Sequence, residues 1–271
     1  MASLGACPAP LALSLLLLPL LLLWPPPLAS AKLPLPAYIK PCNASAPMDE
    51  LEACATRHAQ EGFPSVVKGD RRYKVPALNP LFIPRMVVDD GQGPLGLNLV
   101  ATDVHFGGMQ NVRIDRVRFD MEKKYAWYDV LVPVASIESK YNISGRILLL
   151  PITGYGDCNL TMKDMFISYE YRFNLERRPD GEVYFIPLPH DGFRFNTSRL
   201  YVHLDNLFNG DPLLGDNTNK FMNDNWEEML VSLGPIFSTA ISEIVHSILT
   251  NIFQLVPFTD AFTGTDKYLP P

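Results

Sequence analysis

The sequence predicts an α+β fold in which a highly curved antiparallel sheet wraps one long C-terminal helix and encloses an elongated hydrophobic cavity. Two patterns predict it. Between Leu95 and Leu204, apolar residues recur at every second position, as in strands with one face in water. From Asn219 to Val256 they recur every three or four residues, as in a helix. A helix that is apolar around most of its circumference must be covered on several sides, and a bent sheet can cover it.

The N-terminal segment has the composition of a secretory signal. Residues 1–31 contain no Lys, Arg, Asp or Glu, and their apolar run from Leu11 to Leu23 is followed by Ala29-Ser30-Ala31. This pattern is typical of a cleaved signal peptide, although a basic start is missing. A transmembrane anchor is the alternative, but the run is short for a span of about 20 residues. We therefore expect a signal peptide at 1–31, one secreted, extracellular domain at 32–271, and no stable membrane anchor.

The cysteines and glycosylation motifs agree with secretion. Cys42 and Cys54 lie close in sequence, and a disulfide between them would stabilise the fold by roughly 3 kcal/mol. Cys158 is then left over, either as a buried thiol or as a bridge between chains. We expect a monomer, with a Cys158-linked dimer as the alternative. Four Asn-x-Ser/Thr motifs predict surface N-glycosylation. They begin at Asn43, Asn142, Asn159 and Asn196.

The first structural elements are set by prolines and caps. Ser45 and Pro47 predict the start of a helix that Gly62 and Pro64 end or interrupt. The proline-rich segment 75–84 is expected to run extended along the surface rather than pair in a sheet, because proline lacks a backbone donor.

The strands and the last helix carry two further local signals. The alternation slips by one residue at Arg116, which predicts a β-bulge that bends the sheet. If Asn219–Val256 is one helix, it spans about 57 Å. Gly234-Pro235 should kink it, because proline clashes with the preceding turn.

Apolar residues on the inner strand faces and on the helix are the candidate ligand-binding residues. Each could simply be core, but a bent sheet facing a long helix does not close perfectly, and the gap is suited to an extended apolar ligand. The residues expected to line the cavity are Leu97, Leu99, Val112, Ile114, Phe119, Tyr128, Val132, Ile147, Leu149, Ile167, Tyr169, Tyr171, Phe173, Phe185, Trp226, Met229, Leu230, Leu233, Phe237 and Ile241.

Other chemistries are disfavoured. The formal charge of −6 argues against nucleic-acid binding. Gly91–Gly96 matches a dinucleotide-binding pattern but lacks the strand before and the helix after that it needs. Lipase and zinc-protease motifs do not occur, and the histidines lack metal-ligand spacing. We therefore expect no cofactor, no metal and no catalysis; an esterase with a triad assembled from distant residues is the alternative. The histidines are His58, His105, His190, His203 and His246.

Several stretches together resemble the insect takeout / juvenile-hormone-binding protein family. They are Asp205–Gly210, Leu214-Gly215, Asn219–Trp226, Leu78–Pro84, Tyr141–Gly156 and the pair Cys42 and Cys54, which matches the family's N-terminal disulfide. The resemblance runs from about residue 41 to 262.

The resemblance implies a tubular lipid-binding fold and a non-enzymatic secreted carrier of a small hydrophobic ligand, such as a terpenoid hormone, a fatty-acid-like lipid or an odorant. Juvenile-hormone binders proper carry a second disulfide, and its absence here favours the takeout branch. Asn206, Asn209 and Gly210 are expected to form a turn and Asn219 a helix cap, whereas Trp226 is the aromatic residue expected to reach the cavity. A glycosylated interaction protein with a filled core is the remaining alternative.

Overall fold

The computed structural model describes residues 32–89, 96–148, 150–188 and 192–271. The expected signal peptide, Leu149, His190 and most of the Gly91–Gly96 pattern lie outside these residues. The described residues form an eight-stranded sheet, a two-stranded sheet and several helices, all within one compact unit, Ala31–Pro271.

The large sheet is built on its two longest strands, which pair with each other over the whole length of β5, from Tyr125↔Arg172 to Ile147↔Leu150. Strands β3 and β4 pair with different stretches of β5, and β7, β8 and β9 pair with successive stretches of β6; every pair is antiparallel. The strands are β2 (Leu81–Asp89), β3 (Leu97–Gly107), β4 (Arg113–Asp120), β5 (Tyr125–Ile147), β6 (Leu150–Arg177), β7 (Val183–Pro187), β8 (Phe193–Asn196) and β9 (Arg199–Leu204).

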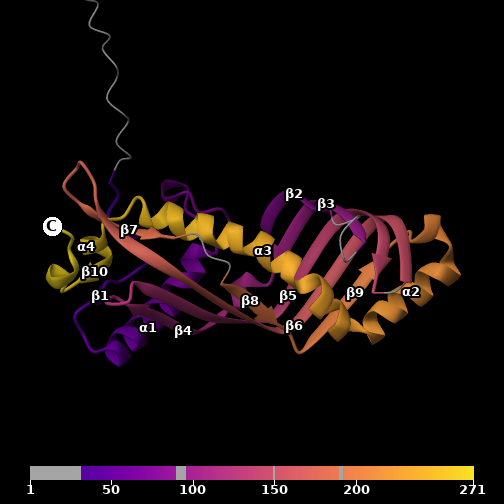
Figure 1. Ribbon diagram of the computed structural model, residues 1–271, viewed down its shortest axis with the longest axis horizontal. Coiled ribbons are helices and arrows are strands. Elements are labelled where there is room, and N and C mark those ends of the chain that lie inside the picture. Colours follow the sequence, from indigo (N-terminus) through magenta and orange to yellow (C-terminus); the bar gives the residue numbers. More distant parts are fainter. Residues whose placement is uncertain (1–31, 90–95, 149, 189–191) are drawn as a thin grey trace, which may run out of the picture. The chain divides into compact units, whose positions relative to one another are not determined.

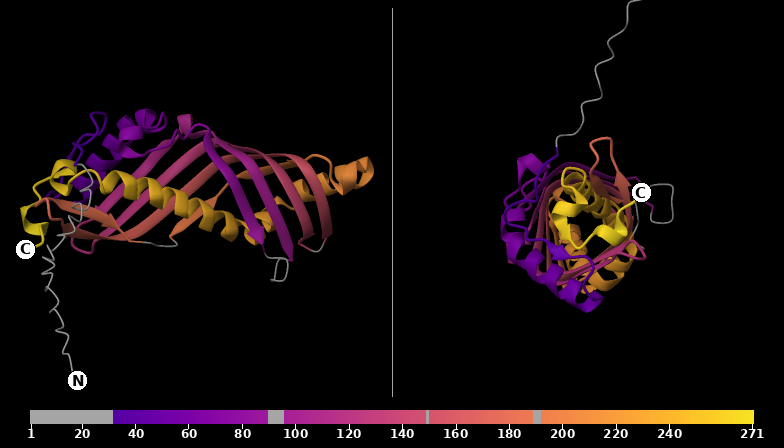
Figure 2. Two further views of the ribbon diagram at one scale, coloured as in Figure 1. Left: turned by 90° about the horizontal axis from the view of Figure 1, so that it is seen from above. Right: turned by 90° about the vertical axis from the view of Figure 1, so that its left-hand side faces the viewer.

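The helices differ in where they meet this sheet. The long helix α3 runs along the concave side, and the end-on view in Figure 2 shows the strands curling around it. Helices α1 and α2 lie beside β4 and β9 (Figure 1). The bounds are α1 (Met48–Val66), α2 (Pro212–Asp224), α3 (Trp226–Phe253) and α4 (Phe258–Ala261), while β1 (Cys42–Asn43) pairs in parallel with β10 (Phe262–Thr263). The predicted fold class is therefore confirmed.

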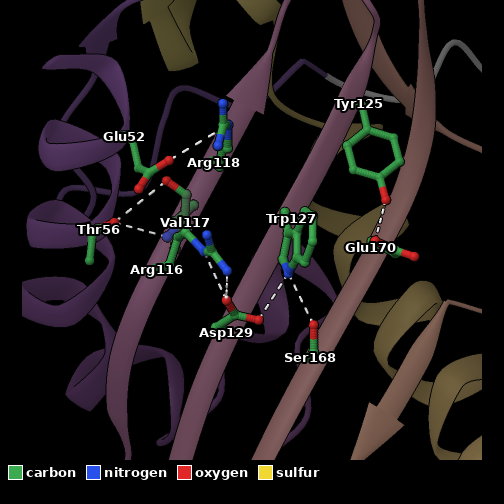
Figure 3. Close-up of polar contacts among 10 residues, drawn as sticks. All are labelled: Glu52, Thr56, Arg116, Val117, Arg118, Tyr125, Trp127, Asp129, Ser168 and Glu170. Atoms are coloured by element: carbon green, nitrogen blue, oxygen red, sulfur yellow. Dashed lines mark hydrogen bonds and ion pairs between the residues drawn. The ribbon is translucent and has the colours of Figure 1, made fainter. Parts of the chain in front are cut away.

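The predicted bulge is present, and it places a charged side chain. The register between β4 and β5 shifts between Ile114 and Arg116. Arg116 then donates from Nε to Asp129 Oδ2 at 2.8 Å, and Trp127 Nε1 donates to Asp129 Oδ1 at 2.9 Å (Figure 3). Asp129 is buried, so these donors supply the hydrogen bonds that water would otherwise make.

Helix α1 continues further than the sequence predicts. It begins directly after Pro47, includes Gly62 and Pro64, and ends at Val66. Gly62 serves close packing instead of ending the helix, since a Cβ at this position would lie 2.7 Å from the backbone oxygen of Tyr38.

The expectation that segment 75–84 stays out of the sheet is wrong for its last residues. Strand β2 begins at Leu81, which pairs with Phe106, and it contains Pro84. The proline is tolerated because β2 pairs only with β3 among the described strands and so lies at the sheet's edge.

The predicted single helix is two helices. Asp211 caps α2, its side chain accepting from Leu214 N, and the chain breaks at Asn225 before α3 begins. Asn219 is therefore not a cap, because it lies in the interior of α2. The predicted kink at Pro235 is present: the segments 226–235 and 237–253 meet at 51°. Among the described residues, no single helix meets the length and composition of a membrane span, and only these two bent segments meet them jointly.

The turn before α2 is present as expected. Asn206, Asn209 and Gly210 all have positive φ, at 55°, 56° and 83°. Asn206 Nδ2 also donates to the backbone oxygen of Tyr155, which ties this turn to β6.

Side chains from two helices satisfy the backbone groups of two outer strands. On α1, Thr56 Oγ1 accepts from Val117 N at 2.8 Å, and Gln60 Oε1 accepts from Ile114 N at 2.6 Å, both on β4 (Figure 3 shows the first). On α2, Asn219 and Asn223 bond the backbone of β9. Unpaired strand edges invite association with other chains, so these pairs, four residues apart on each helix, close the edges.

Candidate ligand-binding site

An enclosed hydrophobic cavity lies between the sheet and the bend in α3. Its volume is about 170 Å³. Strands β2, β3, β5, β6, β8 and β9 supply one wall, and α2 and α3 supply the other. Of the predicted residues, the structure brings together in this wall Leu99, Ile147, Met229, Leu230, Leu233, Phe237 and Ile241.

The few polar side chains in the wall have partners inside the protein. Tyr141 donates its hydroxyl to the backbone oxygen of Asp205 at 2.6 Å, and Cys158 is hydrogen-bonded to Ser139. Burial raises the pKa of the Cys158 thiol to about 11, so it is neutral at physiological pH. The cavity therefore presents an apolar surface to a ligand.

The sequence allows two states for Cys158, a buried thiol or a bridge between chains. Cys158 is the free, buried thiol of the described chain, whereas Cys42 and Cys54 form a disulfide. The expected monomer, with a Cys158-linked dimer as the alternative, stays a prediction.

Methionines make the wall adaptable. Five of them line the cavity, and their unbranched side chains fill irregular space and change rotamer readily. Ligand pockets commonly measure about 300–1,000 Å³, so a drug-sized ligand must enlarge this cavity, and methionine movement offers a way to do so. The five are Met86, Met162, Met165, Met222 and Met229.

The remaining predicted residues lie outside this wall, in packed core. Towards α1 and α4 the interior is filled by aromatic rings: Phe185 stacks on Phe173 at 3.9 Å and on Phe253 of α3 at 4.5 Å. Alternation identifies inward-facing residues, but it does not tell filled interior from empty. The residues so placed are Leu97, Val112, Ile114, Phe119, Val132, Tyr169, Tyr171, Phe173 and Phe185, which are buried, and Tyr128, Ile167 and Trp226, which pack against the core.

Trp226 does not line the cavity. It begins α3, and the guanidinium of Arg199 lies 5.7 Å from its ring centroid. Sequence reasoning also missed the contribution of β2, whose Leu81, Ile83, Met86 and Val88 belong to the wall. Their alternation was a usable signal, hidden by the prolines around it.

A second hollow, here called the β8 groove, adjoins the cavity. It lies between β8 and the bent part of α3, with a volume of about 1060 Å³. Phe195, Leu230 and Gly234 line both hollows. Most of the groove's surface is apolar, but its wall also contains polar side chains, among them Ser238, Thr239 and Glu243.

Among the described histidines, His203 pairs with the carboxylate of Asp205 at 2.9 Å on the exposed surface, while His58 and His246 contact other groups. Cys42, Cys54 and His58 are the described cluster of three candidate metal ligands, but the disulfide uses both sulfurs. In His246, the two ring nitrogens face the hydroxyls of Tyr169 and Thr250 instead of a carboxylate. Burial lowers the pKa of His246.

Comparison with known proteins identifies the family of this chain. The family model for haemolymph juvenile hormone binding protein matches residues 17–263. The chain belongs to this family. It is a family of binding proteins rather than of enzymes, as the sequence predicts.

Individual members of the juvenile hormone binding protein family are distant in sequence but close in fold. The circadian clock-controlled protein daywake of Drosophila yakuba is 24% identical over 236 residues, which cover 84% of this chain and 88% of that protein. Daywake of Drosophila melanogaster is 23% identical with the same coverage. The crystal structure of Epiphyas postvittana Takeout 1 superposes with a TM-score of 0.72 at 25% identity, covering 83% of this chain and 100% of the other.

Proposed function

We propose that this protein is a secreted, non-catalytic carrier that holds one small hydrophobic ligand in its internal cavity. The observation that carries the proposal is the enclosed apolar space between the curled sheet and α3, whose polar side chains are bonded within the protein. Membership of a family named for hormone binding supports it. The ligand class is a terpenoid hormone, a fatty-acid-like lipid or an odorant.

The energetics suit reversible carriage. Burying about 400 Å² of apolar ligand surface at about 25 cal/mol per Å² supplies roughly 10 kcal/mol before costs. Loss of translational and rotational freedom, together with rearrangement of the methionines, removes several kcal/mol of this. The roughly 6–8 kcal/mol that remain correspond to dissociation constants of about 1–50 μM, which suit uptake and release.

Surface features support an extracellular protein. The four glycosylation motifs place their asparagines, Asn43, Asn142, Asn159 and Asn196, at exposed positions. On β5 and β6, Asn142 and Asn159 alternate with the cavity-lining Tyr141 and Cys158, so glycans there would project away from the cavity. A disulfide also suits an oxidising compartment.

Thermal unfolding of delipidated protein tests the proposal. Lipid extracted from insect tissue should raise the Tm by mass action, since a ligand that binds only the folded state stabilises it. Mass spectrometry of the extract retained by the protein would then identify the ligand. No Tm shift with any terpenoid, fatty acid or odorant would contradict the carrier function and favour an interaction protein with a filled core.

A further inference from the structure

The β8 groove adjoins the apolar cavity and, although most of its own surface is apolar, it carries polar side chains. Helix α3 passes β8 at its bend (Figure 1), and the groove between them is walled by Ser238, Thr239 and Glu243 from the helix. From the strand comes Arg194. The groove therefore offers hydrogen-bond donors and acceptors that the cavity does not.

A polar group on a ligand has no partner inside the cavity. The described polar side chains there, Tyr141, Cys158 and Ser139, are bonded to other protein groups. Burying a hydroxyl or an amide without a hydrogen bond costs free energy. A ligand with one polar end is thus best placed with that end outside the cavity.

Gly234 marks where the two spaces meet. It lines both the cavity and the groove, next to Pro235 at the bend of α3. A Cβ at Gly234 would meet no heavy atom within 4 Å outside its own turn of helix, so open space lies beside its Cα. Phe195 and Leu230 border the same passage.

The charges of the groove do not favour an anion. Among its described lining residues, Arg194 and Glu243 carry formal charges. Arg194 Nη2 lies 2.9 Å from Glu170 Oε1, and this ion pair reduces its attraction for another anion. Glu243 is exposed and adds a negative charge.

We propose that the β8 groove is a second subsite that holds the uncharged polar end of an amphipathic ligand, a hydroxyl, ester or amide. The apolar tail passes Gly234 into the cavity. This inference rests on the proposed carrier function, and it narrows the ligand to neutral amphipaths in preference to free carboxylates.

Matched ligands test the polar subsite. Displacement of the fluorescent probe phenylnaphthylamine is measured with decanol and with decanoate at a pH of about 8, where the acid is ionised. We expect decanol to bind about fivefold more tightly, because Glu243 repels the carboxylate. Glu243→Gln should narrow this difference, because it removes the charge that repels the carboxylate. Equal or tighter binding of decanoate to the wild-type protein, or an unchanged difference in Glu243→Gln, would overturn the subsite.

Substitutions at Gly234 test the passage. The control is Glu228→Phe, at an exposed position of α3 that lines neither hollow. Gly234→Phe should fill the passage. We expect decanol binding to weaken by about tenfold or more, because the tail loses buried contacts. Gly234→Leu, a better helix former, provides a second plug if the first variant does not fold. Wild-type affinity in a folded plugged variant would overturn the passage.

The two proposals fail in different ways. If phenylnaphthylamine and every alkyl ligand fail to bind the wild-type protein, the carrier function is wrong. If the probe and both decyl ligands bind without the expected preference for decanol, the carrier function is retained and only the polar subsite is contradicted.

Discussion

Asn219 bonds Leu204 as a neighbouring strand would. Its side-chain Oδ1 accepts from Leu204 N at 2.9 Å, and its Nδ2 donates to Leu204 O at 2.9 Å. One turn later, Asn223 does the same with Val202, at 3.0 and 2.7 Å. Because the side chains of Leu204 and Val202 line the cavity, this helix fixes a strand of the binding site.

Asn219→Ala should therefore destabilise the fold. It removes both partners of the Leu204 backbone, and we expect the free energy of unfolding to fall by about 1–3 kcal/mol. Urea denaturation measures it. Lys220→Ala is the control, since its ion pair with Asp224 is exposed and contributes under about 1 kcal/mol. Similar losses in the two variants would show that the asparagine does not hold the strand.

Asp129 should contribute more to the free energy of unfolding than an ordinary surface carboxylate does. Asp129→Ala removes the buried acceptor of Arg116 and leaves Trp127 Nε1 with Ser168 Oγ alone, 3.0 Å away (Figure 3), and we expect a loss of about 2–3 kcal/mol. In Asp115→Ala, which breaks an exposed pair with Arg113, the loss should stay under about 1 kcal/mol. Chemical denaturation compares them, and a smaller loss in the Asp129 variant would contradict this ranking.

The buried thiol of Cys158 predicts a pH dependence of stability. Its pKa rises to about 11 in the folded protein from 9.0. Between these values the unfolded chain loses the proton while the folded chain keeps it, so stability falls as pH increases. Below pH 9 this contribution is constant. The difference in unfolding free energy between wild type and Cys158→Ala should shift by about 2–3 kcal/mol across the window. Parallel pH profiles for the two proteins would rule this out.

Tyr128 and Tyr171 should be coupled. Their hydroxyl oxygens lie 3.0 Å apart in the packed aromatic core, where burial raises the pKa of both. Tyr128→Phe leaves the other hydroxyl unsatisfied, and we expect a cost of about 1–3 kcal/mol. Adding Tyr171→Phe removes the orphaned group, so the double variant should cost less than the sum of the two singles. A double-mutant cycle measures this coupling, and strict additivity would argue against it.

Local patterns in the sequence predict the fold better than they predict the site. The alternation, the slip at Arg116 and the bend at Pro235 are properties of neighbouring residues, and all three are present in the structure. The local sequence predicts a helix cap at Asn219. This prediction is wrong because the actual partner of Asn219, the backbone of Leu204, is brought to it only by tertiary structure.

The site required knowledge of how the interior is filled. Leu99 and Phe185 both belong to alternating strands, yet one lines the cavity and the other is packed between aromatic rings. The difference depends on what α3 presents opposite each strand. Pro84 likewise obscured β2, because a proline is acceptable in a strand only when that strand lies at an edge.

The most direct test of the carrier function is to fill the cavity from within. Ala101 lines it, whereas the adjacent Thr102 pairs across strands with Arg85 and Lys140 on the other face of β3. Titration with phenylnaphthylamine compares Ala101→Phe with Thr102→Phe. We predict that the first variant stays folded by circular dichroism and loses at least about tenfold in affinity, as expected for ligand contacts displaced by a buried ring. The second should bind like wild type. Unchanged affinity in folded Ala101→Phe would contradict the claim that this cavity holds the ligand.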